Sequence, residues 1–150
     1  MARPFPLQTL LELAQEHSDA AAAHLGVVNG HERVMDQRLQ LLLEYRSEYT
    51  ERLARATQTG MHSIGLRNFR EFIDKIDAAV DAQRALVAKA RSEVVTGRQQ
   101  WHAQQRKLKS FDTLFQRHHS AERKIEARQE QKEQDDFAMK GFLGRRLMAG

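Results

Sequence analysis

The stretch FREFIDKIDAAVDAQRALVAKARSEV, residues 69–94, decides the fold because its apolar residues recur in alternating steps of four and three. A period of 3.5 residues that holds over eight heptads is typical of a coiled-coil seam. The stepping continues to residue 125, and 12 of the 17 positions that it visits are apolar. The positions are Phe69, Ile73, Ile76, Val80, Gln83, Val87, Ala90, Val94, Gly97, Trp101, Gln104, Leu108, Phe111, Phe115, His118, Glu122 and Ile125.

The first half of the chain carries a matching stripe with a spacing of seven. Its main column is Ala14, Ala21, Val28, Met35, Leu42, Tyr49 and Ala56. The predicted companion column is Leu10, His17, His24, His31, Arg38, Tyr45 and Arg52. Four leucines beside this column could also share the seam: Leu11, Leu25, Leu39 and Leu53. Two helical stripes in one chain predict an all-α, antiparallel coiled-coil hairpin.

Proline and glycine give the predicted boundaries. The two prolines stand at positions 4 and 6, and proline fits the first turn of a helix, so we expect the first helix over about 7–57. Gly60 and Gly65 predict a turn over about 58–68. Asn68 followed by Glu71 resembles a capping box, which places the second, longer helix over about 69–136.

A turn centred near residue 62 makes the numbers of facing residues add to about 125, which pairs Leu10 with Phe115 and Tyr49 with Ile76. The second helix then has no partner beyond about residue 118.

Residues 1–136 are predicted to form a single hairpin domain, and residues 137–150 a flexible apolar tail. That tail is too short and too rich in glycine to fold alone, so it would become ordered on a partner.

The heptad spacing of His17, His24 and His31 argues against a metal site. Seven residues of helix rise about 10 Å, whereas the ligands of one ion lie at about 2 Å from it. His118 and Glu122 are four residues apart, but two ligands are too few. We therefore expect no metal. We interpret the three histidines as structural residues at the edge of the seam, and the alternative is that they make the hairpin sensitive to pH.

Composition excludes several classes of protein. The chain has 150 residues and no cysteine, so disulfides and thiol chemistry are absent. No apolar run is long enough to span a bilayer, and the N-terminal stretch lacks the apolar core of a signal peptide. No phosphate-binding glycine loop or nucleophile motif occurs. We therefore expect neither an enzyme nor a cofactor, no small-molecule substrate and no direct membrane insertion.

The net charge of +4 is spread unevenly. Between Arg84 and Lys124 the chain carries 10 basic and 3 acidic residues. This excess fits a solvated helix face or a contact with an acidic partner. A coiled-coil nucleic-acid binder is the alternative, although Trp101 is the one aromatic near the middle of the stretch and no base-stacking motif is present. We expect no nucleic acid among the partners.

Three stretches resemble the FliJ family, the small coiled-coil stalk proteins of the bacterial flagellar type III export apparatus. They are the opening residues 4–11 (PFPLQTLL), residues 42–49 from Leu42-Leu43-Glu44-Tyr45 to Tyr49, and the restart at residues 68–72. The resemblance implies a protein whose terminal segments enter the hexameric export ATPase and whose turn region binds the transmembrane export gate protein. It also implies escort of export chaperones, and a cytoplasmic location at the inner membrane beneath the flagellum. An injectisome-type secretion stalk is a further alternative with the same architecture.

The resemblance assigns the gate-binding residues by position: Arg38, Leu42, Tyr45, Tyr49, Phe72, Ile76, Ala79 and Gln83. For the ATPase surface we choose the basic residues of the unpartnered end of the second helix and the leucines opposite them, because positive charge suits the pore of a protein ring. These residues are Leu10, Leu11, Arg117, Arg123, Lys124 and Arg128, and the alternative is that the charges only keep the protein soluble. An alternative interpretation of Tyr45, Tyr49 and Phe72 is that they cap the seam beside the turn, and both roles are compatible.

Overall fold

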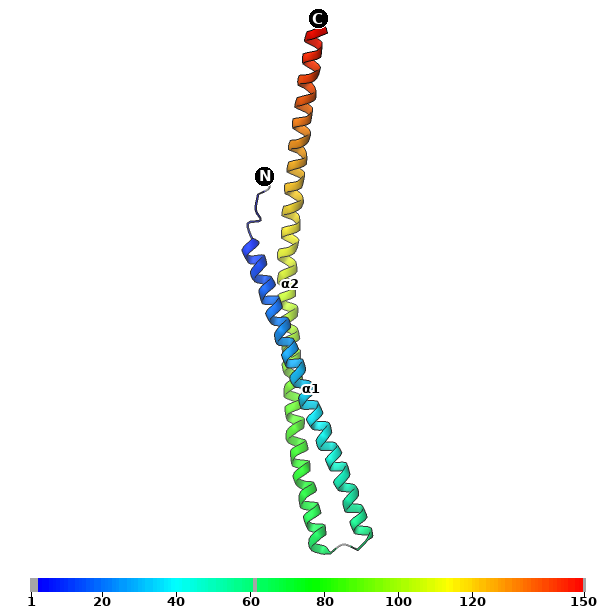
Figure 1. Ribbon diagram of the computed structural model, residues 1–150. Coiled ribbons are helices and arrows are strands. Elements are labelled where there is room, and N and C mark those ends of the chain that lie inside the picture. The colour runs from blue at the N-terminus through cyan, green and yellow to red at the C-terminus, as the bar shows by residue number, and fades with distance from the viewer. Residues whose placement is uncertain (1–2, 61, 150) are drawn as a thin grey trace. The chain divides into compact units, whose positions relative to one another are not determined.

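The computed structural model describes residues 3–60 and 62–149 and shows two helices packed against each other as a hairpin (Figure 1). The helices are α1 (Gln8–Gln58, 51 residues) and α2 (Ser63–Ala149, 87 residues). Within the described residues there is no strand. The predicted all-α hairpin with a longer second helix is therefore confirmed.

The hairpin divides into two compact units. The turn unit is Asp19–Ala103, and it holds most of α1, the turn and the first half of α2. The terminal unit holds the described residues of Met1–Ser18 and Gln104–Gly150. Each unit is described by itself below.

The periodicity of the sequence identified the buried stripe of α2. All seven buried residues of α2 fall on the predicted seam: Ile76, Val80, Gln83, Val87, Ala90, Val94 and Gly97. The main column of α1 is buried at Ala14, Val28 and Met35 and half-buried at its other positions. In the turn unit Met35, Val87 and Ala90 form the core cluster, with Leu39 packed against it.

The companion column of α1 was predicted one residue out of place. Every residue from Leu10 through the histidines to Arg52 in that column is exposed. The next column is buried or half-buried at Leu11, Ser18, Leu25, Glu32, Leu39 and Leu53, and exposed at Arg46. Its four leucines remove more apolar surface from water than histidines would, which selects this face of α1 for the seam. The histidines therefore lie outside the seam.

Contacts across the seam agree with the predicted register. In the turn unit Gln83 Nε2 donates to the Met35 carbonyl oxygen at 2.9 Å, and Arg91 lies 3.7 Å from Asp36. In the terminal unit Gln105 Nε2 donates to Ser18 Oγ at 2.7 Å. The residue numbers in these three pairs add to 118, 127 and 123, close to the expected 125.

The turn between the helices is shorter than predicted. Gly60 has a φ of 80°, a conformation that glycine adopts at little steric cost just after a helix end. His62 caps the start of α2 with both its side chain and its main chain. The Ile64 N–H donates to Nδ1 of the His62 ring at 3.5 Å, and the Leu66 N–H donates to the His62 main-chain carbonyl at 3.1 Å. Because this cap starts α2 at Ser63, the predictions of a capping box at Asn68 and a break at Gly65 were wrong.

The N-terminal strap, which we define as residues 3–7, precedes α1 and packs on α2 in the terminal unit. The Phe5 ring lies edge-on to the Phe115 ring, with centroids 5.6 Å apart and planes at 81°. The predicted Leu10–Phe115 pairing was wrong, because Phe5 occupies that position and Leu10 is exposed.

The C-terminal residues differ from the predicted separate tail, because α2 continues through them to Ala149. Extending an existing helix costs much less than nucleating a new one, so residues that cannot fold alone can lengthen α2. Residues 127–149 are all exposed, which agrees with the prediction that the end of the second helix has no partner helix.

Candidate protein-binding surfaces

The residues predicted to bind the export gate all lie in the turn unit, but they do not share one face. Tyr45 and Phe72 are 47% and 43% exposed, and Arg38 is exposed. Leu42, Tyr49 and Ala79 are half-buried, whereas Ile76 and Gln83 are buried in the seam. The last two side chains therefore stabilise the hairpin and are not available to a partner.

An aromatic surface, which we define as Tyr45, Tyr49 and Phe72, forms beside the turn. The Tyr49 and Phe72 rings lie 4.5 Å apart across the two helices, tilted by 50°. Tyr45 precedes Tyr49 by one helical turn and so lies next to it on α1. The guanidinium of Arg52 lies 5.1 Å from the centre of the Tyr49 ring, within the range of a cation–π interaction. Tyr49 and Phe72 therefore pack on each other across the two helices, while Tyr45 and Phe72 keep exposed area.

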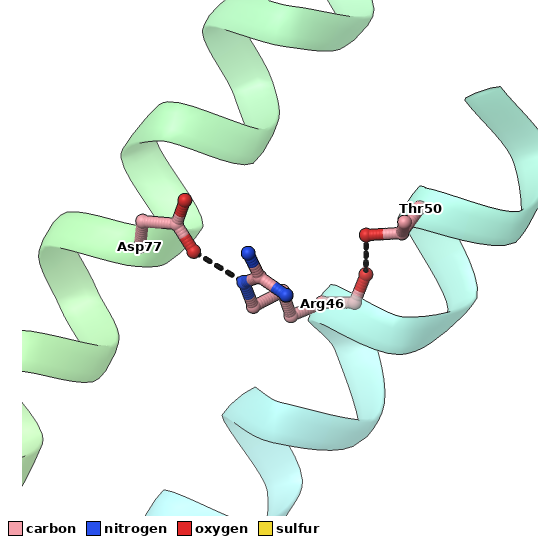
Figure 2. A network of polar contacts seen from close by, with 3 residues as sticks. All are labelled: Arg46, Thr50 and Asp77. Carbon is pink, nitrogen blue, oxygen red and sulfur yellow. Dashed lines mark hydrogen bonds and ion pairs between the residues drawn. The ribbon is translucent and has the colours of Figure 1, made fainter. Parts of the chain in front are cut away.

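The opposite flank of the turn unit is occupied by ion pairs between α1 and α2. Arg46 pairs with Asp77, and Figure 2 shows the guanidinium of Arg46 directed at that carboxylate across the gap between the helices. Thr50 Oγ1 donates to the Arg46 carbonyl at 2.7 Å. Farther along the same flank Arg91 lies 3.7 Å from Glu32.

The hydrogen bond from Arg46 to Asp77, together with the attraction between their charges, raises the pKa of the Arg46 guanidinium. This cation therefore stays protonated at every physiological pH. Both side chains are nearly half exposed, so solvent screens the pair and its contribution to stability is small. The two flanks of the turn unit therefore differ in chemistry. One flank is polar, and its charges pair with each other; the other flank is aromatic.

The residues predicted to bind the ATPase all lie in the terminal unit. Arg117, Arg123, Lys124 and Arg128 are exposed on α2, and none forms an ion pair within the described residues. Leu10 is exposed on α1, whereas Leu11 is half-buried in the seam column. A shallow hollow on α2 is lined by Arg117 and Lys124 with four small or polar residues: Thr113, Gln116, Ser120 and Ala121. The unpaired cations leave this face positively charged.

Two sets of contacts were missed by the sequence analysis. The ion pairs Arg46–Asp77 and Arg91–Glu32 each join a residue in the Leu11 column of α1 to a residue beside the seam of α2, and many such pairings are possible in a charged coiled coil. The docking of the N-terminal strap was also missed. Its signal was present in the order Pro4-Phe5-Pro6, because an aromatic residue between two helix-breaking residues favours an extended segment with an anchor.

Residues 3–60 and 62–149 contain neither a cluster of metal-binding side chains nor a membrane-spanning helix. No group of three or more histidine, cysteine, aspartate or glutamate side chains is arranged to hold a metal ion. No helix in the same residues is long and apolar enough to cross a membrane.

The fold and these surfaces define an α-helical coiled-coil hairpin with an aromatic surface beside its turn and a long exposed end of α2. The chain belongs to the FliJ family, because the family model described as "Flagellar FliJ protein" matches residues 3–147. It is 28% identical over 143 residues to the flagellar FliJ protein of Salmonella typhi, which covers 95% of this chain and 97% of that protein. The chain is also 27% identical over 143 residues to the flagellar FliJ protein of Escherichia coli (strain K12), and the match again covers 95% of this chain and 97% of that protein. The resemblance seen in the sequence is therefore confirmed at the level of the family.

Proposed function

We propose that this protein is the stalk or coupling component of the flagellar type III export apparatus. In this proposal the terminal unit binds the hexameric export ATPase, and the turn unit binds the transmembrane export gate protein. The protein also escorts export chaperones and acts without catalytic machinery of its own. It works at the cytoplasmic face of the inner membrane, at the flagellar base. Membership in the FliJ family over residues 3–147 is the observation that carries the proposal.

The aromatic surface supports gate binding by the turn unit. Partly exposed aromatic rings that are held in place by neighbours are frequent anchors of protein interfaces. Tyr49 and Phe72 hold each other across the seam, so their exposed edges are presented with little loss of side-chain entropy on binding. Within the predicted set we therefore assign the contact to the aromatic surface with Arg38, and exclude Ile76 and Gln83 because they are buried.

The terminal unit supports ATPase binding for a different reason. Its α2 segment carries unpaired cations at Arg117, Arg123, Lys124 and Arg128. Beyond them, exposed apolar side chains such as Phe137 and Leu147 lie on a helix with no partner helix. Positive charge next to exposed apolar surface suits an acidic, partly apolar pore in a protein ring.

The test is the turnover of the hexameric export ATPase with and without this protein. A stalk that binds inside the ring should promote ring assembly and raise turnover. Unchanged turnover at saturating protein would remove the ATPase part of the proposal.

Gate binding is tested with Tyr45→Ala and Phe72→Ala. If either ring anchors the interface, affinity for the cytoplasmic part of the gate protein should fall about tenfold or more. Val95→Ala is the matched control, because Val95 is 52% exposed in the same unit but lies on the side of the ion pairs. Equal affinities for all three variants would contradict the assignment.

A further inference from the structure

Two residues of the N-terminal strap, Arg3 and Phe5, contact three residues of α2. The Arg3 amide nitrogen donates to Glu122 Oε2 at 3.3 Å, and His118 Nε2 donates to the Arg3 carbonyl at 2.9 Å. The Phe5 ring lies 5.6 Å from both the Phe115 ring and the His118 ring. Residues 3–5 therefore contact α2 through the main chain of Arg3 and one aromatic anchor, and residues 6–7 form the turn that leads into α1.

The surface beneath the strap is a continuation of the coiled-coil seam. Phe115, His118 and Glu122 are seam positions of α2, and all three are half-buried. Helix α1 begins at Gln8, so the strap covers these positions where a helix would otherwise pack. One seam step farther, Ile125 is 45% exposed. The seam of α2 is therefore longer than the helix that fills it.

The strap can leave α2 without unfolding either helix. Its contacts with α2 are exposed hydrogen bonds and ring edges, and segments with such contacts open at low cost. Pro4 and Pro6 keep the residues before them extended, so the released strap does not simply lengthen α1. Phe5 remains tied to α1 by its carbonyl, which accepts from Gln8 N–H at 3.1 Å.

We infer that Phe115, His118 and Glu122 form a binding site that the N-terminal strap covers in the free protein and that a partner occupies after displacing the strap. The occupant is an extended or helical segment of the export ATPase with an apolar or aromatic side chain in place of the Phe5 ring. This inference rests on the proposed function. Arg117 and Lys124 stand exposed near the site and favour an occupant with acidic flanks.

The first test locks the strap. The chain has no cysteine, so Arg3→Cys with Ala121→Cys creates a unique pair. Both residues are exposed, and the strap contacts of Arg3 come from its main chain, so they survive the substitution. A bismaleimide with a disulfide in its linker closes the pair, and a reductant then cleaves it. The locked and cleaved proteins differ only in that one bond.

We expect the locked full-length protein to bind the export ATPase at least about tenfold more weakly than the cleaved protein, because the site is then closed in nearly every molecule. Equal binding by the two forms would overturn the inference and leave the proposed function standing. If neither these forms nor the unmodified protein bind the ATPase, the proposed function fails and the inference fails with it.

The second test removes the anchor. Phe5→Ala should bind the ATPase at least as tightly as the unmodified protein, because the site is uncovered more often. Thr9→Ala is the control, since Thr9 is exposed on α1 just after the strap. Weaker binding by Phe5→Ala, with Thr9→Ala unchanged, would show that Phe5 itself contacts the ATPase, and would overturn its role as a cover.

Discussion

The seam of the turn unit can be tested by one pair of matched substitutions in α2. Val87 is 3% exposed and belongs to the core cluster with Met35 and Ala90, whereas Val95 lies two turns farther along α2 and faces solvent. Replacing either valine by alanine raises helix propensity by the same amount, less than about 0.7 kcal/mol. The difference between the two variants therefore isolates burial in the seam.

The expected difference follows from the atoms removed. Val87→Ala takes two buried methyl groups out of the seam, which costs about 1.6 kcal/mol at about 0.8 kcal/mol per group. The cavity left behind brings the total to about 2 kcal/mol. With a urea slope of about 2 kcal/mol per molar, the midpoint should fall about 1 M below that of Val95→Ala.

The assay is urea unfolding of the full-length protein, followed by circular dichroism at 222 nm. Both substitutions lie in the turn unit, so the comparison does not depend on how the terminal unit unfolds. Coincident unfolding curves for Val87→Ala and Val95→Ala would refute the assignment of Val87 to a packed interhelical seam.

Three further predictions concern polar and terminal residues. Gln83→Leu should change the free energy of unfolding by no more than about 1 kcal/mol, because the side chain of Gln83 bonds only the Met35 carbonyl, which is already part of a helix. The same variant should keep its affinity for the gate protein, because Gln83 is buried. A clear loss of that affinity would show that Gln83 is accessible to the gate protein. Arg46→Gln should slightly lower the urea midpoint at low salt. The drop in midpoint should be the same at every pH between 6 and 9, because the raised pKa of Arg46 keeps the guanidinium charged until stronger alkali. In 1 M salt the drop should disappear, because salt screens the exposed pair of Arg46 with Asp77; a drop that persists in salt would show that the ion pair is not its cause. Deleting residues 137–150 should lower the helical signal per molecule without moving the unfolding midpoint, because 13 of the 87 residues of α2 are removed and none is buried; an unchanged signal would show that this segment is not helical in solution.

The fold was largely predictable because apolar residues in steps of four and three fall on one face of a helix, and that face must pack against another helix. The position of Val87 or Ala90 in that pattern is enough to predict burial, whatever the partner helix contributes. The companion column of α1 was harder to identify, since Leu11 and Leu25 stand directly beside Leu10 and His24 in the sequence. A one-residue change rotates a helix by about 100°, and only the sum of the packed contacts selects the face.

The helix ends were less predictable than the seam. The start of α2 depends on the ring and carbonyl of His62, a residue that ranks low among expected N-caps. The sequence predicted a flexible C-terminal tail because a short helix is unstable on its own. The structure has these residues in α2, since the preceding helix removes the cost of nucleation.

The candidate surfaces depended on the family resemblance, and their extent depended on burial. The seam pattern already placed Ile76 and Gln83 among buried positions, yet the position-by-position comparison assigned them to a binding surface. Phe72 lies beside the seam in the pattern, and the structure leaves it partly exposed against Tyr49. The N-terminal strap follows from no periodicity, because its contacts with α2 come from the main chain of Arg3 and from one ring.

The central claim is that the turn unit and the terminal unit bind different partners of the export apparatus. The most direct measurement uses one variant, Tyr45→Ala with Phe72→Ala, and records both its affinity for the gate protein and its stimulation of the export ATPase. The account predicts that gate binding falls by more than about tenfold while ATPase stimulation is retained. Loss of both activities in a variant with an unchanged unfolding midpoint, or retention of both, would contradict it.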